Sequence, residues 1–492
     1  MKPINAFLLT DGYKTSHREL YPDDTTLVYS NFTPRSLRHA IKGLEKIVSF
    51  GQQMVVKQIH DYFNEGFFHR DKQEVIDEIY TELSMYLGCK YDVSAFEDLH
   101  DLGYLPVKIK AIQEGEIVPV KTPILTIVNT HPKFFWLTNY LETLISFLLW
   151  KPATSASIAY VYRKLTEKFV MLTDPANSFL IDFMQHDFSA RGLDSLDATI
   201  SSGLGHATSF LGSDTLTAIH GARKYYAAEG PVVLSVKATE HSVACANTIF
   251  NADGSTDELE GIRYQLSKVP AGIFSMVSDT FDLWRMCTQY LPALKQEILA
   301  RPGKLVIRPD SGNPVDIVCG LDNGVTHNRT PQDKGVIELL WEVFGGTINN
   351  QGYKVLDPHI GAIYGDSITI ERAEAIYTRL EKKGFAATNI VLGVGSFTYQ
   401  LNTRDTLGFA MKATYIEKNG VPQNIFKDPI TDDGTKKSAT GLLKVVKENG
   451  EYKLIDKVSK EEENTGELKT IYENGTFYNT TTFQEIRERL KK

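Results

Sequence analysis

Short apolar runs alternate with polar clusters and helical stretches through the middle of the chain, roughly residues 151–400. Six runs have the length of strands, at residues 179–183, 232–236, 273–277, 305–307, 360–364 and 390–392. Apolar strands separated by helices are typical of a parallel sheet buried on both faces, so the pattern predicts a barrel or a doubly wound sheet. In both architectures, ligands bind where the carboxyl ends of the strands open into loops.

The first region, residues 1–150, mixes helices and strands. The pattern predicts a strand pair at residues 107–112 and 117–120, joined by a Glu-Gly turn, and a further strand at 124–128. Residues 134–150 form the most apolar stretch, but they contain Asn and Glu. This stretch predicts a buried helix rather than a membrane span.

The last region, residues 401–492, has the pattern of β-hairpins. Asn-Gly pairs lie at residues 419–420, 449–450 and 474–475, each between strand-like stretches. Asn-Gly is a strong hairpin signal because both residues adopt positive φ in a tight turn. A final helix is predicted to begin near Phe483.

Composition narrows the function classes. The 492 residues are 42% hydrophobic and 23% charged, as in ordinary globular proteins of two or three structural units. The net charge of −8 argues against nucleic-acid binding through a broad basic surface. The four cysteines form no Cys-x-x-Cys pair, and the apolar patch within residues 1–14 is too short for a signal peptide. We therefore expect a soluble cytoplasmic protein with reduced thiols and no membrane partner.

The most informative string is Arg-Pro-Asp-Ser-Gly-Asn-Pro at residues 308–314, directly after an apolar run. Such residues can form a purely structural turn. A turn does not require an Arg beside the Asp, however. Arg308 offers a planar fork to phosphate, and the carboxylate of Asp310 can accept hydrogen bonds from ribose hydroxyls or help to hold Mg²⁺.

Two further Asp residues, Asp279 and Asp366, each follow an apolar run and precede a helical pattern. Each could simply cap its helix. Together with Asp310, however, they place three carboxylates at three strand ends, which favours a shared polyhydroxyl or metal-bearing ligand. The Gly-Val-Gly-Ser string at 393–396 fits a small phosphate cradle or, equally, a plain turn.

His241 follows another strand end, within Thr-Glu-His-Ser at residues 239–242. A lone His is often structural, and no second His lies at the spacing of a zinc site. The neighbouring Glu240 could orient His241 or raise its pKa, which favours a chemical role over a purely structural one. Farther upstream, Phe188 could be a core residue and Asp214 a helix cap.

At these strings the sequence resembles the nicotinamide phosphoribosyltransferases over nearly its whole length. Arg-Pro-Asp-Ser-Gly and Glu-His-Ser, in this order, are highly specific, and nicotinate relatives would be expected to have Met-Ala-His-Ser in place of Thr-Glu-His-Ser. The resemblance also includes strings at residues 10–14, 21–22, 186–188, 278–279, 365–366, 403–405 and 426–429.

The resemblance implies an α/β fold: an irregular α/β barrel with a second α+β domain built from both chain termini. In this sequence those parts correspond to residues 151–400, 1–150 and 401–492. It further implies a homodimer with shared active sites. The implied reaction converts nicotinamide and phosphoribosyl pyrophosphate to nicotinamide mononucleotide and pyrophosphate, in NAD salvage. Mg²⁺ would be held mainly through pyrophosphate, and ATP hydrolysis would be coupled through phosphorylated His241.

The resemblance also assigns roles to residues. Tyr13 of the partner subunit and Phe188 would enclose the pyridine ring, and Asp214 would receive the carboxamide. The implied catalytic set is His241, Asp310, Asp279 and Glu240. The remaining implied substrate-binding residues are Arg191, Ser235, Arg308, Gly365, Asp366, Gly395, Ser396 and Arg404, with Arg35, Lys412 and Lys427 from the other subunit.

Other functions stay open on the sequence. The same scaffold could use nicotinate or quinolinate, but a carboxylate substrate would favour a cation where Asp214 lies. An inactive homologue acting as a binding or signalling protein is a second class, although such a protein would be expected to lose His241 or one of the Asp residues. From architecture alone, a sugar-phosphate enzyme also fits.

Overall fold

A computed structural model describes residues 2–365, 367–431 and 437–492. The chain forms two compact units. Unit 1 comprises Met1–Ser157, His220–Glu229 and Asn402–Lys492, and unit 2 comprises Ile158–Ile219 and Gly230–Leu401. Both ends of the chain therefore belong to unit 1, together with most of α8 (Thr217–Tyr226) from the middle of the sequence.

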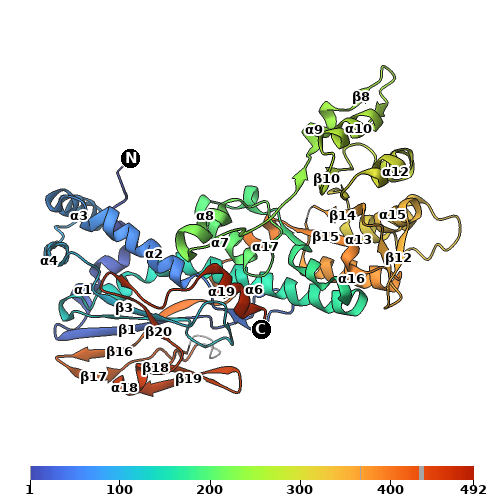
Figure 1. The fold of residues 1–492 in the computed structure, drawn as a ribbon. Coiled ribbons are helices and arrows are strands. Elements are labelled where there is room, and N and C mark those ends of the chain that lie inside the picture. Colours follow the sequence, from blue (N-terminus) through green and yellow to red (C-terminus); the bar gives the residue numbers. More distant parts are fainter. Residues whose placement is uncertain (1, 366, 432–436) are drawn as a thin grey trace. The chain divides into compact units, whose positions relative to one another are not determined.

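Unit 1 contains a seven-stranded antiparallel sheet (Figure 1). Its strands, in spatial order, are β17 (Val421–Asn424), β16 (Ala410–Lys418), β1 (Thr25–Thr33), β5 (Leu125–Asn129), β3 (Val107–Ala111), β20 (Lys469–Glu473) and β21 (Thr476–Phe477). The helices of unit 1 include α1 (His17–Leu20), α2 (Gln52–Phe63), α3 (Lys72–Leu87), α4 (Ser94–Leu102) and α19 (Phe483–Leu490). The sheet joins the two ends of the chain, because β1 pairs with β16.

The three predicted hairpins are confirmed. The Asn-Gly pair at 419–420 joins β16 to β17, the pair at 449–450 joins β18 (Leu442–Glu448) to β19 (Glu451–Val458), and the pair at 474–475 joins β20 to β21. All six residues have positive φ, between 47° and 86°. The final helix, α19, begins at Phe483 as predicted.

The predicted pairing of residues 107–112 with 117–120 is wrong. β3 pairs with β5 and β20, whereas β4 (Ile117–Val118) pairs with β2 (Ile47–Val48). The reason is the buried Glu114, whose carboxylate accepts backbone N–H groups of Gly51 at 3.1 Å and Gln53 at 2.6 Å. These bonds direct the chain after β3 toward the start of α2 instead of back along β3.

Unit 2 contains six parallel strands that curl into an irregular barrel. Their spatial order is β6 (Gln185–Asp187), β15 (Ile390–Val394), β14 (Ile360–Tyr364), β11 (Leu305–Arg308), β10 (Phe274–Val277) and β7 (Lys237–Ala238). Two isolated parallel bridges, Asp187 with Ser213 and Gly212 with Leu234, connect the β6 edge toward the β7 edge. The α/β barrel is therefore confirmed.

Helices alternate with these strands, as the pattern predicts. They include α7 (Leu196–Ala207), α9 (His241–Ala246), α10 (Leu259–Lys268), α12 (Leu291–Ala300), α13 (Pro314–Cys319), α15 (Val336–Phe344), α16 (Ile370–Lys382) and α17 (Ser396–Gln400). In parallel strands all carboxyl ends lie at one end of the barrel, so the loops that follow them converge there.

Two of the six predicted strands are misplaced. Residues 179–183 lie in a 3-10 helix, Pro175–Phe183, in which Phe179 is 66% exposed, and the strand is the polar β6 that follows. Within 232–236 only Leu234 forms a bridge, and β7 begins at Lys237. Strands this short are defined by backbone hydrogen bonds to the neighbouring strands, so they form without an apolar run of their own.

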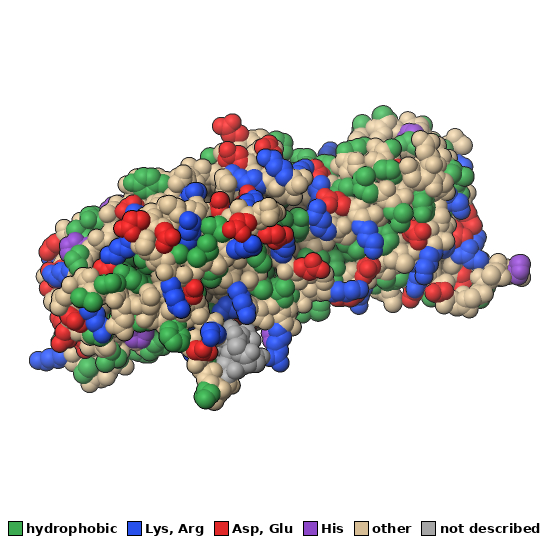
Figure 2. Space-filling model, turned by 90° about the horizontal axis from the view of Figure 1, so that it is seen from below, with side chains coloured by type: hydrophobic (Ala, Val, Ile, Leu, Met, Phe, Trp, Pro, Cys, Tyr) green, Lys and Arg blue, Asp and Glu red, His purple; other side chains and the backbone are tan. Residues whose placement is uncertain are grey.

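The apolar stretch 134–150 is helical and largely buried, but its main helix, α6 (Glu142–Thr173), begins later and extends farther. Among the described residues α6 alone is long and apolar enough to cross a membrane by length and composition, and 78% of its most apolar window is buried within the chain. On the face shown in Figure 2, Lys and Arg side chains are interspersed with Asp and Glu.

Candidate active site

The predicted site residues of the middle region follow the strands of unit 2. Asp279 follows β10, Arg308 is the last residue of β11, and Gly365 follows β14. Gly395 and Ser396 come directly after β15. These residues therefore lie at the carboxyl end of the barrel, where the architecture predicts a ligand site.

His241 lies at the start of α9 and contacts residues from two other loops. Its Nδ1 is 3.0 Å from the Thr280 hydroxyl, and its Nε2 is 3.3 Å from Asp310 Oδ1 and 4.0 Å from Asp279 Oδ1. A hydroxyl and two carboxylates thus fix the imidazole from both ring nitrogens. Thr280, which directly follows Asp279, was not among the predicted site residues.

Glu240 has a different role from the one the sequence suggested. Its carboxylate accepts a hydrogen bond from the Ser242 hydroxyl, and the residue is exposed. The carboxylate beside His241 belongs instead to Asp310. Adjacent residues at a helix start point in different directions, so sequence proximity did not identify the partner of His241.

Asp279 supports the turn that carries Asp310. Its Oδ2 accepts the backbone N–H groups of Asp310 at 2.9 Å and Ser311 at 2.8 Å. The alternative that Asp279 is a helix cap is wrong, because Asp282 caps the next helix, α11 (Leu283–Arg285). Asp279 therefore fixes the shape of the 308–314 turn from a neighbouring strand end.

Two carboxylates at this place fit a divalent cation. His241, Asp279 and Asp310 each offer a ligand atom, and these atoms lie within 4.8 Å of one another. Asp279 Oδ1 is buried and has no hydrogen-bond partner among the described residues. Carboxylate oxygens are preferred ligands of Mg²⁺, and a buried oxygen without a partner is costly unless a ligand satisfies it.

Arg308 is held at the rim of this group. Its Nη2 donates to the Thr239 carbonyl at 2.7 Å, and its backbone N–H donates to the Ser278 hydroxyl at 3.2 Å. Its Nε is buried without a hydrogen-bond partner in the described part of the chain. Gly365 lies alongside, since a Cβ there would be 3.4 Å from the Asp310 Cβ. Asp366, also predicted for this site, lies outside the described residues.

Phe188 follows β6 and packs against β15. A Cβ on Gly393 would lie 2.8 Å from the Phe188 ring, so glycine is required at 393 for the ring to occupy this position. Ser396 packs against Gly192, where a Cβ would come within 2.2 Å of its hydroxyl. Arg191 lies in the same short helix as Gly192, Ala190–Gly192, and is exposed.

The carboxylate of Asp214 is hydrogen-bonded by two side chains instead of capping a helix. Its Oδ1 accepts hydrogen bonds from His186 Nε2 at 2.9 Å and from the Ser235 hydroxyl at 2.5 Å. Burial raises the pKa of Asp214, but these two hydrogen bonds and the charge interactions with His186 and Arg308 outweigh burial and bring that pKa below its ordinary value. The group is an anion at neutral pH. Its partner His186 was not among the predicted site residues.

The basic site residues predicted in the first and last regions of the chain, among them Arg35, Arg404 and Lys412, belong to unit 1. Lys412 is on β16, opposite Asn31 of β1. Burial lowers the pKa of Lys412, and the positive charges of Arg35, Lys427 and Lys14 lower it further, against the opposing effect of Glu142. Arg404 lies close enough to the exposed Tyr13 to lower its pKa, although burial and the acidic neighbours of Tyr13 raise that pKa overall. These residues form a basic cluster suited to phosphate.

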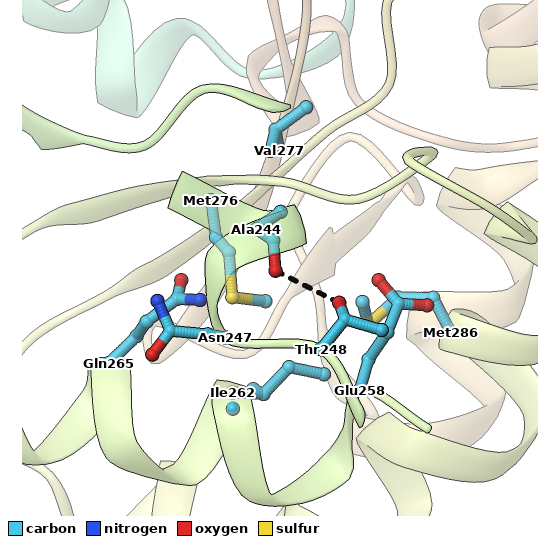
Figure 3. Close-up of a pocket in the computed structure, with 10 residues that line it drawn as sticks. Ala244, Asn247, Thr248, Glu258, Ile262, Gln265, Met276, Val277 and Met286 are labelled. Carbon is cyan, nitrogen blue, oxygen red and sulfur yellow. Dashed lines mark hydrogen bonds between the residues drawn. The ribbon is translucent and has the colours of Figure 1, made fainter. Parts of the chain in front are cut away.

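A separate cavity lies beneath α9 (Figure 3). It has a volume of about 10 Å³ and is lined by residues of α9, α10 and β10 and of adjoining segments, among them Gln265 of α10, Glu258 just before α10, and Met286. Such a volume holds about one water molecule. This cavity is therefore too small for a substrate, and the candidate site remains at the loops above the barrel.

Comparisons with known proteins agree with this arrangement. The model of the nicotinate phosphoribosyltransferase family matches residues 183–476. A nicotinamide phosphoribosyltransferase of Acinetobacter baylyi is 47% identical, with 100% of this chain and 97% of the relative covered. A relative of the same name in Xanthomonas campestris is 32% identical, with 98% and 97% covered.

Solved structures support the fold. The crystal structure of human nicotinic acid phosphoribosyltransferase has a TM-score of 0.56 at 14% identity, covering 98% of this chain and 93% of that one. Nicotinate-nucleotide pyrophosphorylase from Pyrococcus furiosus has a TM-score of 0.55 at 18% identity, covering 99% and 94%. At these identities the likeness concerns the fold alone.

Proposed function

Because the chain belongs to the nicotinate phosphoribosyltransferase family, we propose that it transfers the phosphoribosyl group of phosphoribosyl pyrophosphate to nicotinamide. The products are nicotinamide mononucleotide and pyrophosphate. The proposal agrees with the names of relatives that span this chain almost completely.

The reaction needs positioning more than proton transfer. The neutral pyridine nitrogen of nicotinamide attacks C1 of the ribose, and the bond from C1 to the pyrophosphate oxygen breaks. No proton leaves the nitrogen, so no general base is required. The Arg308 guanidinium suits the departing pyrophosphate, and Phe188 offers an aromatic face to the pyridine ring. Bound Mg²⁺, with Asp279 and Asp310 as its protein ligands, would neutralise charge on the leaving group.

The observation that favours nicotinamide over nicotinate is the charge of Asp214. An ionised carboxylate only accepts hydrogen bonds, so it suits the NH₂ of a carboxamide and repels the carboxylate of nicotinate. The hydrogen bonds from His186 and Ser235 favour the ionised form of Asp214. Asp214 thus offers the substrate a negative charge at neutral pH.

We also propose that His241 accepts a phosphoryl group from ATP and so couples ATP hydrolysis to synthesis. His241 is partly exposed beside two carboxylates that suit Mg²⁺, as transfer from ATP requires. A homodimer in the cytoplasm would complete the site. In it, the basic cluster of one subunit, including Arg404 and Lys412, would meet the barrel loops of the other.

The decisive experiment is product analysis. The protein is mixed with phosphoribosyl pyrophosphate, Mg²⁺ and either nicotinamide or nicotinate, with and without ATP, and nucleotides are separated chromatographically. We expect nicotinamide mononucleotide and an equal amount of pyrophosphate, with more product when ATP is present. Product from nicotinate alone would overturn the substrate assignment. No product from either pyridine would favour a binding or signalling role.

A further inference from the structure

His186, which has no assigned role in the reaction, lies directly behind Asp214. Its side chain is 12% exposed, whereas that of Asp214 is 43% exposed. We propose that His186 is a positioning residue for amide recognition: together with Ser235 it occupies Asp214 Oδ1 and thereby presents Oδ2 to the carboxamide. The inference rests on the proposed function and assigns a residue that determines its specificity.

The backbone places the three side chains together. β6 carries His186, and the next extended segment carries Asp214, whose backbone N–H donates to the Asp187 carbonyl at 2.9 Å. The third segment carries Ser235, and it is joined to the second by the bond from Ser213 N–H to the Leu234 carbonyl at 3.1 Å. The register of three adjacent segments therefore determines the position of the carboxylate.

The hydrogen bonds determine which oxygen is left for substrate. With a proton on its Nε2, His186 donates to Asp214 Oδ1, and the Ser235 hydroxyl donates to the same atom. Two donors at one carboxylate oxygen use its two lone-pair directions. The carboxamide NH₂ of nicotinamide then has Oδ2 as its acceptor.

The same imidazole also contacts the aromatic residue of the site. The rings of His186 and Phe188 are 4.6 Å apart between centroids, with planes tilted by 36°. His186 lies on β6, and Phe188 directly follows that strand. Gly212 allows this packing, because a Cβ there would lie 3.0 Å from His186 Nδ1. His186 thus links the amide acceptor to the Phe188 ring.

The test compares His186→Phe with His186→Gln. Phenylalanine keeps the ring packing but removes the donor, whereas glutamine can place an amide N–H near the position of Nε2. For His186→Phe we expect kcat/KM for nicotinamide to fall about 10- to 100-fold, as for loss of a hydrogen bond to a charged group. We expect a smaller fall for nicotinate, so the selectivity ratio should change by about 10-fold. His186→Gln should retain most of the ratio.

A double-mutant cycle with Asp214→Asn separates positioning from packing. If His186 acts through Asp214, His186→Phe should cost little more in the Asp214→Asn background. Ser235→Ala, which removes the other donor from an exposed residue, should change the ratio in the same direction and covers the case in which His186→Phe does not fold.

The outcomes distinguish the two proposals. If the wild-type protein uses nicotinate alone, the proposed function is wrong. If it uses nicotinamide but His186→Phe and Ser235→Ala lower kcat/KM equally for both substrates, the proposed function stands and the inference is wrong. Equal losses from His186→Phe in the wild-type and Asp214→Asn backgrounds would also overturn it.

Discussion

Replacing Asp279 by Ala tests whether one carboxylate shapes the turn at residues 308–314. Its Oδ2 accepts the backbone N–H groups of Asp310 and Ser311 at 2.9 and 2.8 Å, and its side chain is 6% exposed. The change removes both bonds without touching the residues of the turn. We therefore expect Asp279→Ala to act on the geometry of the turn.

The size of the effect follows from these two bonds. A hydrogen bond to a charged group contributes about 1.5–3 kcal/mol, so the pair contributes about 3–6 kcal/mol. Ser311 is exposed, so water can replace part of the hydrogen bonding to its N–H, and the lower end of this energy range applies. About 3 kcal/mol corresponds to about a 100-fold smaller population of the correctly shaped turn. Asp279→Asn retains an acceptor without the charge and should lose about 10-fold.

The assay is kcat/KM for phosphoribosyl pyrophosphate at several Mg²⁺ concentrations, with urea unfolding as the control for stability. If Asp279 acts only as a brace, Asp279→Asn should show the same loss of about 10-fold at every Mg²⁺ concentration. If Oδ1 also binds the cation, Asn should require more Mg²⁺ than the wild-type protein. An Asp279→Ala protein within twofold of wild-type kcat/KM would show that the turn holds its shape without the carboxylate, so Asp279 would not be its brace.

Four further outcomes are expected. Arg404→Ala and Asp310→Ala proteins, each nearly inactive, should regain partial activity when mixed and allowed to exchange subunits; demonstrated heterodimers without activity would contradict a shared site. Acid-labile phosphate from labelled ATP should disappear in His241→Ala, and persistent labelling would place the phosphate elsewhere. Burial lowers the pKa of His206 below its ordinary value, so the unfolded chain binds a proton there more readily than the folded protein. The free energy of unfolding should therefore fall as the pH drops below about 6.5. Between pH 7.5 and 5.5, Tm should decrease more in the wild-type protein than in His206→Gln. Gly393→Ala should raise KM for nicotinamide and lower Tm, at a cost of about 1–3 kcal/mol from overpacking against the ring beside it, and unchanged values would show that the ring has room to move.

The apolar strands and polar loops predicted a parallel sheet with alternating helices, either a barrel or a doubly wound sheet, and the family resemblance implied the barrel. The pattern misplaced β6 because Gln185–Asp187 is polar, and the apolar run before it forms a 3-10 helix. It mispaired β4 because the buried Glu114 binds the start of α2. The first error arises because a polar strand has no apolar run to mark it. The second concerns backbone pairing over a long sequence distance, which local patterns do not record.

The sequence predicted which residues belong to the site, but not which of them contact one another. Strand-end loops led directly to His241, Asp279 and Asp310, which the fold brings together. The partner of Asp214 could not be found in this way, because His186 is 28 residues away on another segment. Glu240 was favoured because it adjoins His241 in sequence, yet it bonds to a serine instead.

The pairing of β1 with β16 has a consequence for synthesis of the protein on the ribosome. β1 ends at Thr33, and its partner strand begins at Ala410. At about 5–20 residues per second, roughly 20–75 s pass between the emergence of the two strands. During that interval Val28 and Phe32, which are fully buried in the finished sheet, have an unpaired strand edge beside them. The nascent chain is therefore expected to need chaperone protection early, and truncation just before residue 410 should leave it prone to aggregation.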